Sequence, residues 1–181
     1  MESGKLLIAE PSIFGDQNFH RSIVIMVEKK NKGFLGFIIN KPLGYELKDI
    51  LPEIQISFPL YNGGPVEQDN LFFVHNAGHL IPGSFKIDDK LFWGGDFEKV
   101  LALVNDGVLS PKDIRFFLGY SGWSSDQLKQ EIGANSWVVV ENPFAANILS
   151  HQTEGLWREQ MKALGGKYVI WSNTPENPYH N

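Results

Sequence analysis

Three side chains in this sequence could carry acid–base chemistry on a charged substrate. His75 and Glu131 are candidate proton-transfer groups, because imidazole and carboxyl groups serve as general acids and bases, and Arg21 could hold an anion. An enzyme that used them would have to bring all three into one pocket. His75 has a second interpretation, because it stands at the end of a predicted strand, where structural hydrogen bonds could hold its ring.

Other common catalytic patterns are missing from the sequence. The chain has no cysteine, which excludes disulfides, thiolate metal sites and cysteine nucleophiles. His75 and His79 have a metal-binding spacing only if they lie on a helix, and Gly78 between them disfavours a helix. Neither nucleotide-binding glycine motif occurs, and Ser121 lacks a nucleophile-elbow context because Gly122 follows it directly. We therefore assign no catalytic residue, metal or cofactor.

Residues 116–137 form the most unusual segment. We expect a buried strand over residues 114–120, a glycine-rich turn that carries Tyr120 and Trp123, and then a helix capped by Ser124. The free N–H groups at the start of a helix bind anions readily, and an aromatic ring beside them could stack on a planar ligand. The alternative is that Trp123 anchors the turn in the hydrophobic core.

Two glycine pairs are predicted to lie in turns. Gly63 and Gly64 precede Pro65, and Gly94 and Gly95 precede a predicted helix. Glycines at such positions supply a positive φ or allow two chain segments to cross closely. A small cradle for an anion is the alternative interpretation.

The composition is that of one ordinary globular domain. The chain has 181 residues, of which 43% are hydrophobic and 20% charged, and we expect a single domain over residues 1–181 with a loose tail from about residue 173. No apolar run approaches the ~20 residues that span a bilayer, and the short run at residues 6–9 is no signal peptide. We expect a cytoplasmic protein. The net charge of −5 disfavours nucleic acid as a partner.

The predicted strands occur in clusters and do not alternate regularly with helices. We expect strands at residues 5–9, 22–27, 34–39, 70–75, 114–120 and 137–140, with a hairpin turn at residues 29–33. Helices are expected to follow the N-caps Asp96 and Ser124 and to cover residues 153–164, with a short helix at residues 45–51. This order favours an α+β fold with a mostly antiparallel, strongly bent sheet.

Five segments together resemble the AlgH/YqgE family. They are KLLIAEPSIFGDQNFHRSIVIMVE, GFLGFIINKPLG, NGGPVEQDNLFFVHN, LFWGGDF and FFLGYSGWSSDQLKQEIGANSWVV, in the order in which the family has them. The resemblance implies a bacterial cytoplasmic protein whose bent sheet forms a pseudo-barrel flanked by helices. It implies no particular reaction, although one branch of the family carries the label of a transcriptional regulator.

The family motifs supply a set of candidate binding positions. Two positions depart from the family pattern, which commonly has a histidine at Lys29 and a glycine at Asp126. The candidate positions are Arg21, Asn40, Pro42, Gly63, Gly64, Pro65, His75, Gly94, Gly95, Gly119, Tyr120, Gly122, Trp123, Gln127 and Glu131.

These motifs are rich in glycine, proline, asparagine and aromatic residues and poor in titratable groups. We therefore expect a non-enzymatic regulatory or adaptor domain that binds a protein or a small ligand. Its surface would consist of residues 40–42, 63–65 and 120–123, if the fold gathers them. The alternatives are an enzyme that uses His75 and Glu131, and a transcriptional regulator that contacts DNA.

Overall fold

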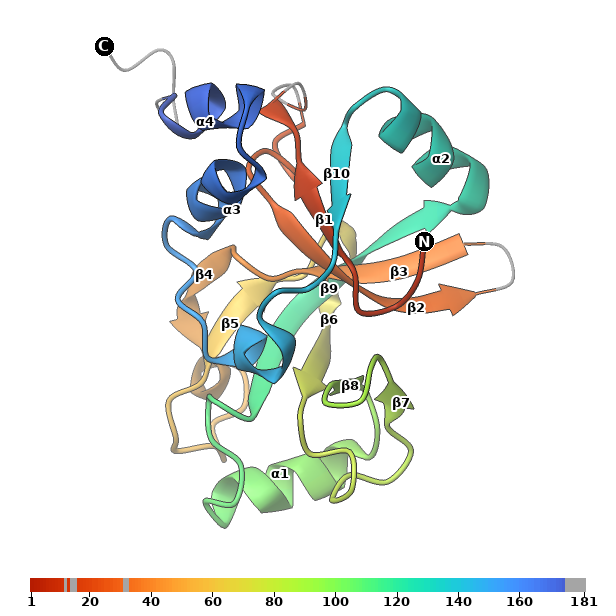
Figure 1. Ribbon diagram of the computed structural model, residues 1–181. Helices are drawn as coiled ribbons and strands as arrows, with labels where there is room; N and C mark the ends of the chain where they lie inside the picture. The colour runs from red at the N-terminus through yellow and green to blue at the C-terminus, as the bar shows by residue number, and fades with distance from the viewer. Residues whose placement is uncertain (12, 14–15, 31–32, 175–181) are drawn as a thin grey trace.

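The computed structural model describes residues 1–11, 13, 16–30 and 33–174 (Figure 1). The predicted turn at residues 29–33 and the predicted tail from residue 173 therefore lie partly outside the described residues. In chain order the elements are β1 (Leu6–Ala9), β2 (Ile23–Lys30), β3 (Gly33–Ile38), β4 (Pro42–Glu46), η2 (Leu47–Asp49), β5 (Pro59–Asn62), β6 (Val66–His75), β7 (Phe85–Lys86), β8 (Phe92–Trp93), α1 (Phe97–Asn105), β9 (Ile114–Ser124), α2 (Ser125–Gly133), β10 (Trp137–Val140), η3 (Ala145–Leu149), α3 (Leu156–Leu164) and α4 (Lys167–Ser172).

The strands form one strongly curled sheet. Its main path runs β10-β1-β2-β3-β9-β6-β8-β7, and every neighbouring pair along this path is antiparallel. Strand β5 pairs with β9 in parallel beside that path. The sheet curls into a half-barrel flanked by helices, which confirms the predicted α+β fold with a bent antiparallel sheet.

Strand β9 runs through the middle of this sheet. Its first half pairs with β5 and β6, and its second half pairs with β3. The predicted glycine-rich turn after residue 120 was wrong, because the chain continues as a strand to Ser124. Pairing with a distant hairpin keeps these residues extended, and local sequence carries no signal for such a long-range contact.

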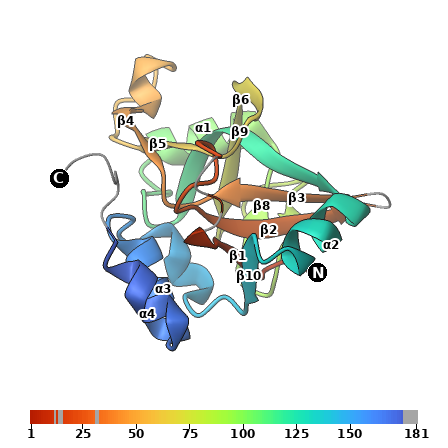
Figure 2. The same ribbon diagram turned by 90° about the horizontal axis from the view of Figure 1, so that it is seen from above.

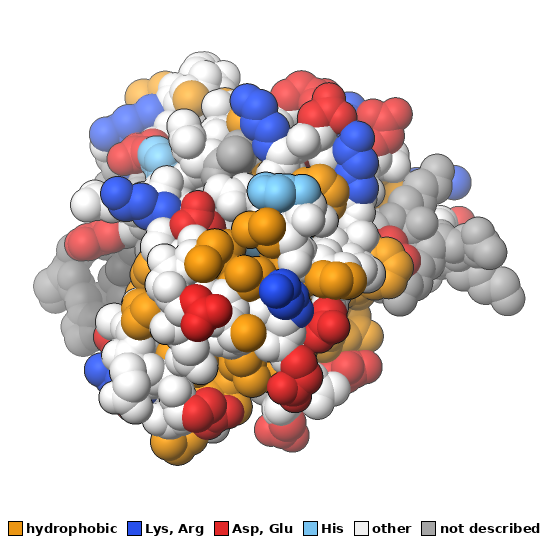
Figure 3. All heavy atoms as spheres, turned by 90° about the horizontal axis from the view of Figure 1, so that it is seen from below, with side chains coloured by type: hydrophobic (Ala, Val, Ile, Leu, Met, Phe, Trp, Pro, Cys, Tyr) orange, Lys and Arg blue, Asp and Glu red, His pale blue; other side chains and the backbone are white. Residues whose placement is uncertain are grey.

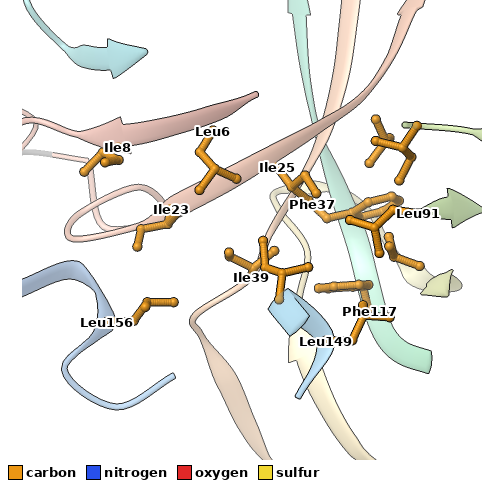
Figure 4. Packing of buried hydrophobic residues seen from close by; sticks show 14 of the residues in the cluster. Leu6, Ile8, Ile23, Ile25, Phe37, Ile39, Leu91, Phe117, Leu149 and Leu156 are labelled. Atoms are coloured by element: carbon orange, nitrogen blue, oxygen red, sulfur yellow. The ribbon is translucent and has the colours of Figure 1, made fainter. Parts of the chain in front are cut away.

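The main hydrophobic core fills the concave side of the sheet. Figure 4 shows Leu6 and Ile8 of β1 and Ile23 and Ile25 of β2 facing Phe37, Ile39, Leu149 and Leu156, and all eight are buried. Segment 148–161 therefore closes the half-barrel with apolar side chains. Burial of such residues is the dominant favourable term in folding.

The helices lie at three sides of the sheet. Figures 1 and 2 show α3 and α4 together on one side, α2 on the opposite side and α1 at the far end. Helix α1 has the predicted cap, since Asp96 accepts a hydrogen bond from the Lys99 amide, and Ser124 caps α2 in the same way through Gln127.

Two helix predictions need correction, and one helix was not predicted. Helix α3 begins at Leu156, after Gly155, and not at residue 153. Helix α4 was not predicted; its six residues are too few to show a clear hydrophobic period. The predicted helix over residues 45–51 is only the single turn η2, because Pro42–Glu46 pairs with Pro59–Asn62 as a strand.

Candidate functional site

The fold brings three of the family motifs together at a crossing of chain segments. The Asn62 amide donates to the Lys41 carbonyl at 2.9 Å, and the Gly63 amide donates to the Leu118 carbonyl at 2.9 Å. Ser121 Oγ donates to the Gly63 carbonyl at 3.1 Å. Parts of the three segments 40–42, 63–65 and 120–123, on which a binding surface was expected, therefore lie side by side.

Glycines make this crossing possible. A Cβ atom on Gly63 would collide with the Gly119 carbonyl oxygen, and one on Gly64 would collide with the backbone of Tyr120. Gly119 itself has a φ of +71°. The interpretation of Gly63 and Gly64 as residues for a close crossing therefore matches the structure, and the crossing is packed backbone, with no space for an anion between the segments.

Trp123 and Glu131 belong to a structural cluster behind the sheet. Trp123 is 4% exposed and packs against Phe19 and Trp137. Glu131 accepts hydrogen bonds from the indole N–H groups of both tryptophans at 2.9 and 2.7 Å, and Gln127 donates to its other oxygen at 2.8 Å. The interpretation of Trp123 as a core anchor fits this geometry, and the carboxylate that was considered for proton transfer positions two indole rings.

His75 is fully buried at the end of β6. Its Nδ1 accepts a hydrogen bond from the Ala77 amide at 3.2 Å, so the proton lies on Nε2, 3.1 Å from the Gly94 carbonyl oxygen. Burial lowers the pKa of His75, and the Gly94 carbonyl opposes this only in part. Gly94 and Gly95, with φ of +63° and +112°, form the turn that presents this carbonyl. The ring is held by structural bonds, as the second interpretation expected.

Arg21 lies in a different part of the molecule, beside α3 and the end of α4. Its backbone adopts a φ of +53°, and Asn40 fixes it by donating to the Arg21 carbonyl at 2.9 Å while accepting from the Ile23 amide at 2.8 Å. The guanidinium stands 5.0 Å from the ring centroid of Trp157 and donates to the Thr174 carbonyl at 2.7 Å.

Arg21 and Asn40 line a cavity of about 400 Å³. We call it the second cavity, because it adjoins another, the first cavity, which is lined by Arg115. Neither His75 nor Glu131 reaches its wall, so the three candidate groups for acid–base chemistry are not in one pocket. The lining residues are His20, Arg21, Asn40, Lys41, Thr153, Glu154, Gly155, Trp157 and Arg158.

Sequence reasoning missed Arg115, which lies on the wall of the adjoining first cavity of about 470 Å³. Arg115 is 5% exposed, and its guanidinium donates to the carbonyls of Ile39, Leu149 and His151 at 2.8, 2.7 and 3.1 Å. It also stands 4.5 Å from the ring centroid of Tyr61. Burial lowers its pKa, although an arginine stays charged. The sequence signal that could have identified it is that Arg115 is a single cation within the otherwise apolar run IRFF.

The two cavities share Thr153 and Glu154, so we treat them as one basic groove. One wall is the connection between β3 and β4, where Arg115 binds the Ile39 carbonyl and Asn40 holds Arg21. The other wall is the segment between η3 and α3. The charged residues along it are Arg21, Lys41, Lys112, Arg115, Glu154 and Arg158.

A third cavity, of about 400 Å³, is apolar and lies between β6 and α1. Its lining includes Phe72, Phe73 and Phe97. Figure 3 shows the face that contains α1, where apolar side chains are interspersed with acidic ones. Phe85, at 56% exposed, and Val108, at 52%, add to the exposed apolar surface of the molecule.

The described part of the chain contains neither a cluster of metal-ligating side chains nor a membrane-spanning helix. No group of three or more His, Asp or Glu side chains there could hold a metal ion. None of the helices in the described ranges combines the length and the apolar composition needed to cross a bilayer.

Comparison with known proteins identifies the family. The AlgH-like family profile matches residues 6–169 of the chain. The chain belongs to the AlgH-like family. It is 41% identical to a UPF0301 protein of Chlorobium phaeobacteroides over 179 residues, which cover 98% of this chain and 95% of that protein. It is also 41% identical to a UPF0301 protein of Bacteroides fragilis over 182 residues, covering 98% and 90% of the two chains.

Solved structures of two further proteins share the AlgH-like fold. The AlgH protein of Pseudomonas aeruginosa superposes with a TM-score of 0.71 at 27% identity, over 95% of this chain and 93% of that one. A crystal structure of a Corynebacterium diphtheriae protein gives a TM-score of 0.73 at 22% identity, over 96% and 93%. The resemblance drawn from the sequence motifs is therefore confirmed.

Proposed function

We propose that this AlgH-like protein is a non-enzymatic binding domain with a regulatory or adaptor role, and that its ligand is an anion held in the basic groove. One observation carries the proposal. Among the residues that the structure describes, five Lys and Arg side chains line the groove and one acidic side chain, Glu154, does so, although the chain has 21 Asp and Glu against 16 Lys and Arg and a net charge of −5. A concave surface of one sign concentrates ions of the opposite sign.

Fixed side chains support the proposal, because a preorganised site loses little conformational entropy when a ligand binds. Lys41 donates to the carbonyls of Gln17 and Asn18 at 3.3 and 2.7 Å, and burial lowers its pKa. Arg21 is held over the Trp157 ring. Three cations of the groove, Arg115 included, are therefore positioned before any ligand arrives.

The candidate catalytic groups His75 and Glu131 already make structural hydrogen bonds, and this also favours a binding role over catalysis. His75 and Glu131 hold backbone and indole groups in two separate places, so a reaction that uses both of them has no support. Arg21 is the one member of that set on the groove, where it would act as an anion contact. The proposal keeps the cytoplasmic location expected from the sequence.

The test uses the exposed cation Arg158, which lies on the second cavity. Pyrophosphate and citrate are each titrated into isotope-labelled full-length protein, and the amide signals are followed by NMR. A final concentration of about 10 mM would nearly saturate a site with a Kd of about 1 mM. We expect amide shifts confined to residues near the groove. Arg158→Gln should weaken binding about twofold to fivefold, as expected for one exposed charge pair.

Lys162→Gln is the matched control, because Lys162 is exposed on the same helix but does not line either cavity. It should leave the affinity unchanged. Equal weakening by both variants would mean that general charge attracts the anion, and an absence of localised shifts with either probe would contradict the proposed function.

A further inference from the structure

Arg115 carries a buried charge that has no acidic partner among the residues that the structure describes. Its contacts are three backbone carbonyls and the face of the Tyr61 ring. Buried cations are usually compensated by a carboxylate, because carbonyl dipoles offset only part of the cost of removing a charge from water. The charge of Arg115 is therefore compensated only in part by its contacts, and Arg115 lines the first cavity, as Glu154 does.

Apolar residues line about half of the first cavity beside this cation. Its volume, about 470 Å³, is in the range of pockets that hold small organic molecules. Such walls favour a ligand with a hydrocarbon body, which they would remove from water. The apolar lining residues are Phe58, Pro59, Tyr61, Pro111, Ile114 and Leu149.

The lining of the cavity also includes polar residues, and these bear on whether a carboxylate or a phosphate fits beside Arg115; they are Lys112, Ser150, His151, Gln152, Thr153 and Glu154. The hydroxyl of Ser150 already donates to the Asn147 carbonyl at 3.2 Å, and Arg115 already satisfies three carbonyls. Because Glu154 also lines the cavity, a carboxylate with one negative charge meets less like-charge repulsion there than a phosphate with nearly two. Lys112, exposed on the cavity wall, adds a second positive charge.

We infer that the first cavity binds an organic acid whose carboxylate compensates the charge of Arg115 and whose apolar body lies against the cavity walls. This inference rests on the proposed function, and it names the class of ligand for one half of the groove. The second cavity, with Arg21, Lys41 and Arg158, remains a separate anion site in the other half of the groove.

The experiment compares 3-phenylpropionate with its neutral analogue 3-phenylpropionamide on the full-length protein. Both probes have the same apolar body, so only the charge differs. The Arg115 Nε–H resonance and the amides of residues 149–151 report on the cavity directly. We expect the carboxylate to shift these signals and to bind at least about tenfold more tightly than the amide, the usual difference for a charge-assisted hydrogen bond.

A variant pair tests the position without disturbing the buried arginine. Lys112→Gln should weaken the binding of 3-phenylpropionate about twofold to fivefold. Lys99→Gln, which changes an exposed lysine on α1, should leave this affinity unchanged. Equal binding of the acid and the amide would overturn the inference. If pyrophosphate or citrate shifts groove residues while 3-phenylpropionate leaves Arg115 unmoved, the inference fails and the proposed function stands. If none of the probes acts on the groove, both fail.

Discussion

His75 and Arg115 are buried on adjacent strands, and burial affects the two residues differently. In the pairing of β6 with β9, Val74 lies opposite Arg115 and His75 opposite Ile114. The guanidinium cannot lose its proton at physiological pH, so its charge must be compensated by neighbours or by a ligand. The imidazole can lose its proton, and burial stabilises its neutral form.

This difference predicts that His75 makes the protein less stable in mild acid. The pKa of His75 in the folded protein lies below the unfolded value of about 6.5. As the pH falls below that value, His75 is therefore protonated in the unfolded chain while it stays neutral in the folded protein. The free energy of unfolding should then fall by up to about 1.4 kcal/mol per pH unit. Chemical denaturation at about pH 7.5 and 5.5 measures it.

His75→Gln should reduce this pH dependence, and His79→Gln, which changes an exposed histidine nearby, should not. If the two variants had the same pH dependence as the wild-type protein, another group would be responsible.

At the same scale, sequence analysis found the structural residues better than the groove. The roles of His75 and of Trp123 as buried residues were among the interpretations offered, because both lie in short, strongly patterned segments. The groove was missed because its cations come from distant parts of the chain. Only the curled sheet brings Arg21, Lys112 and Arg158 to one surface.

Helix ends are the elements whose local chemistry predicts structure best. Asp96 caps α1 through a hydrogen bond from the Lys99 amide at 3.1 Å. Asp96→Ala should lower the free energy of unfolding by about 1 kcal/mol, the typical cost of losing an N-cap. Asp106→Ala, at the other end of α1, should be neutral or slightly stabilising, because it removes a negative charge from the helix C-terminus. Thermal denaturation of both variants measures the difference, and similar destabilisation would contradict the capping role.

Element boundaries set by distant partners were harder to predict. The caps of α1 and α2 need only a few neighbouring residues, and both were predicted correctly. The continuation of β9 through Gly119 and Gly122 depends on β3, more than 80 residues earlier in the chain, where Gly33 pairs with Ser124 and Gly36 with Ser121. Glycine in a sequence signals a turn and a close chain approach equally well, so only the fold distinguishes them.

At the scale of the whole molecule, the two ends of the chain depend on each other. Trp157 Nε1 donates to the Ala9 carbonyl at 2.8 Å, and Tyr168 Oη donates to Glu10 Oε1 at 2.6 Å. Leu156 and Met161 cover the apolar face of β1 and β2. The C-terminal helices thus complete the core and also form one wall of the groove.

A chain that ends at Gln152 should therefore lose its cooperative unfolding transition. Removing Leu156, Trp157 and Met161 from the core forfeits roughly 1.5–3 kcal/mol for each side chain, which together approach the whole stability of a typical domain. Urea denaturation would show the loss of the cooperative transition, and binding of an apolar fluorescent dye would show the exposed core. A truncated chain that unfolded at the same urea concentration as the full chain, without binding the dye, would contradict this dependence.

The crossing of Gly63, Gly64 and Gly119 has a consequence for how members of this family can diverge. Two of the five segments that identify the family supply these glycines, which let strands pass without side chains between them, so these two segments preserve the crossing. Lys112, Arg115 and Arg158 lie outside those segments. A relative could keep the glycines of the crossing and have other residues in place of these cations, so that the same fold would bind different ligands in different bacteria.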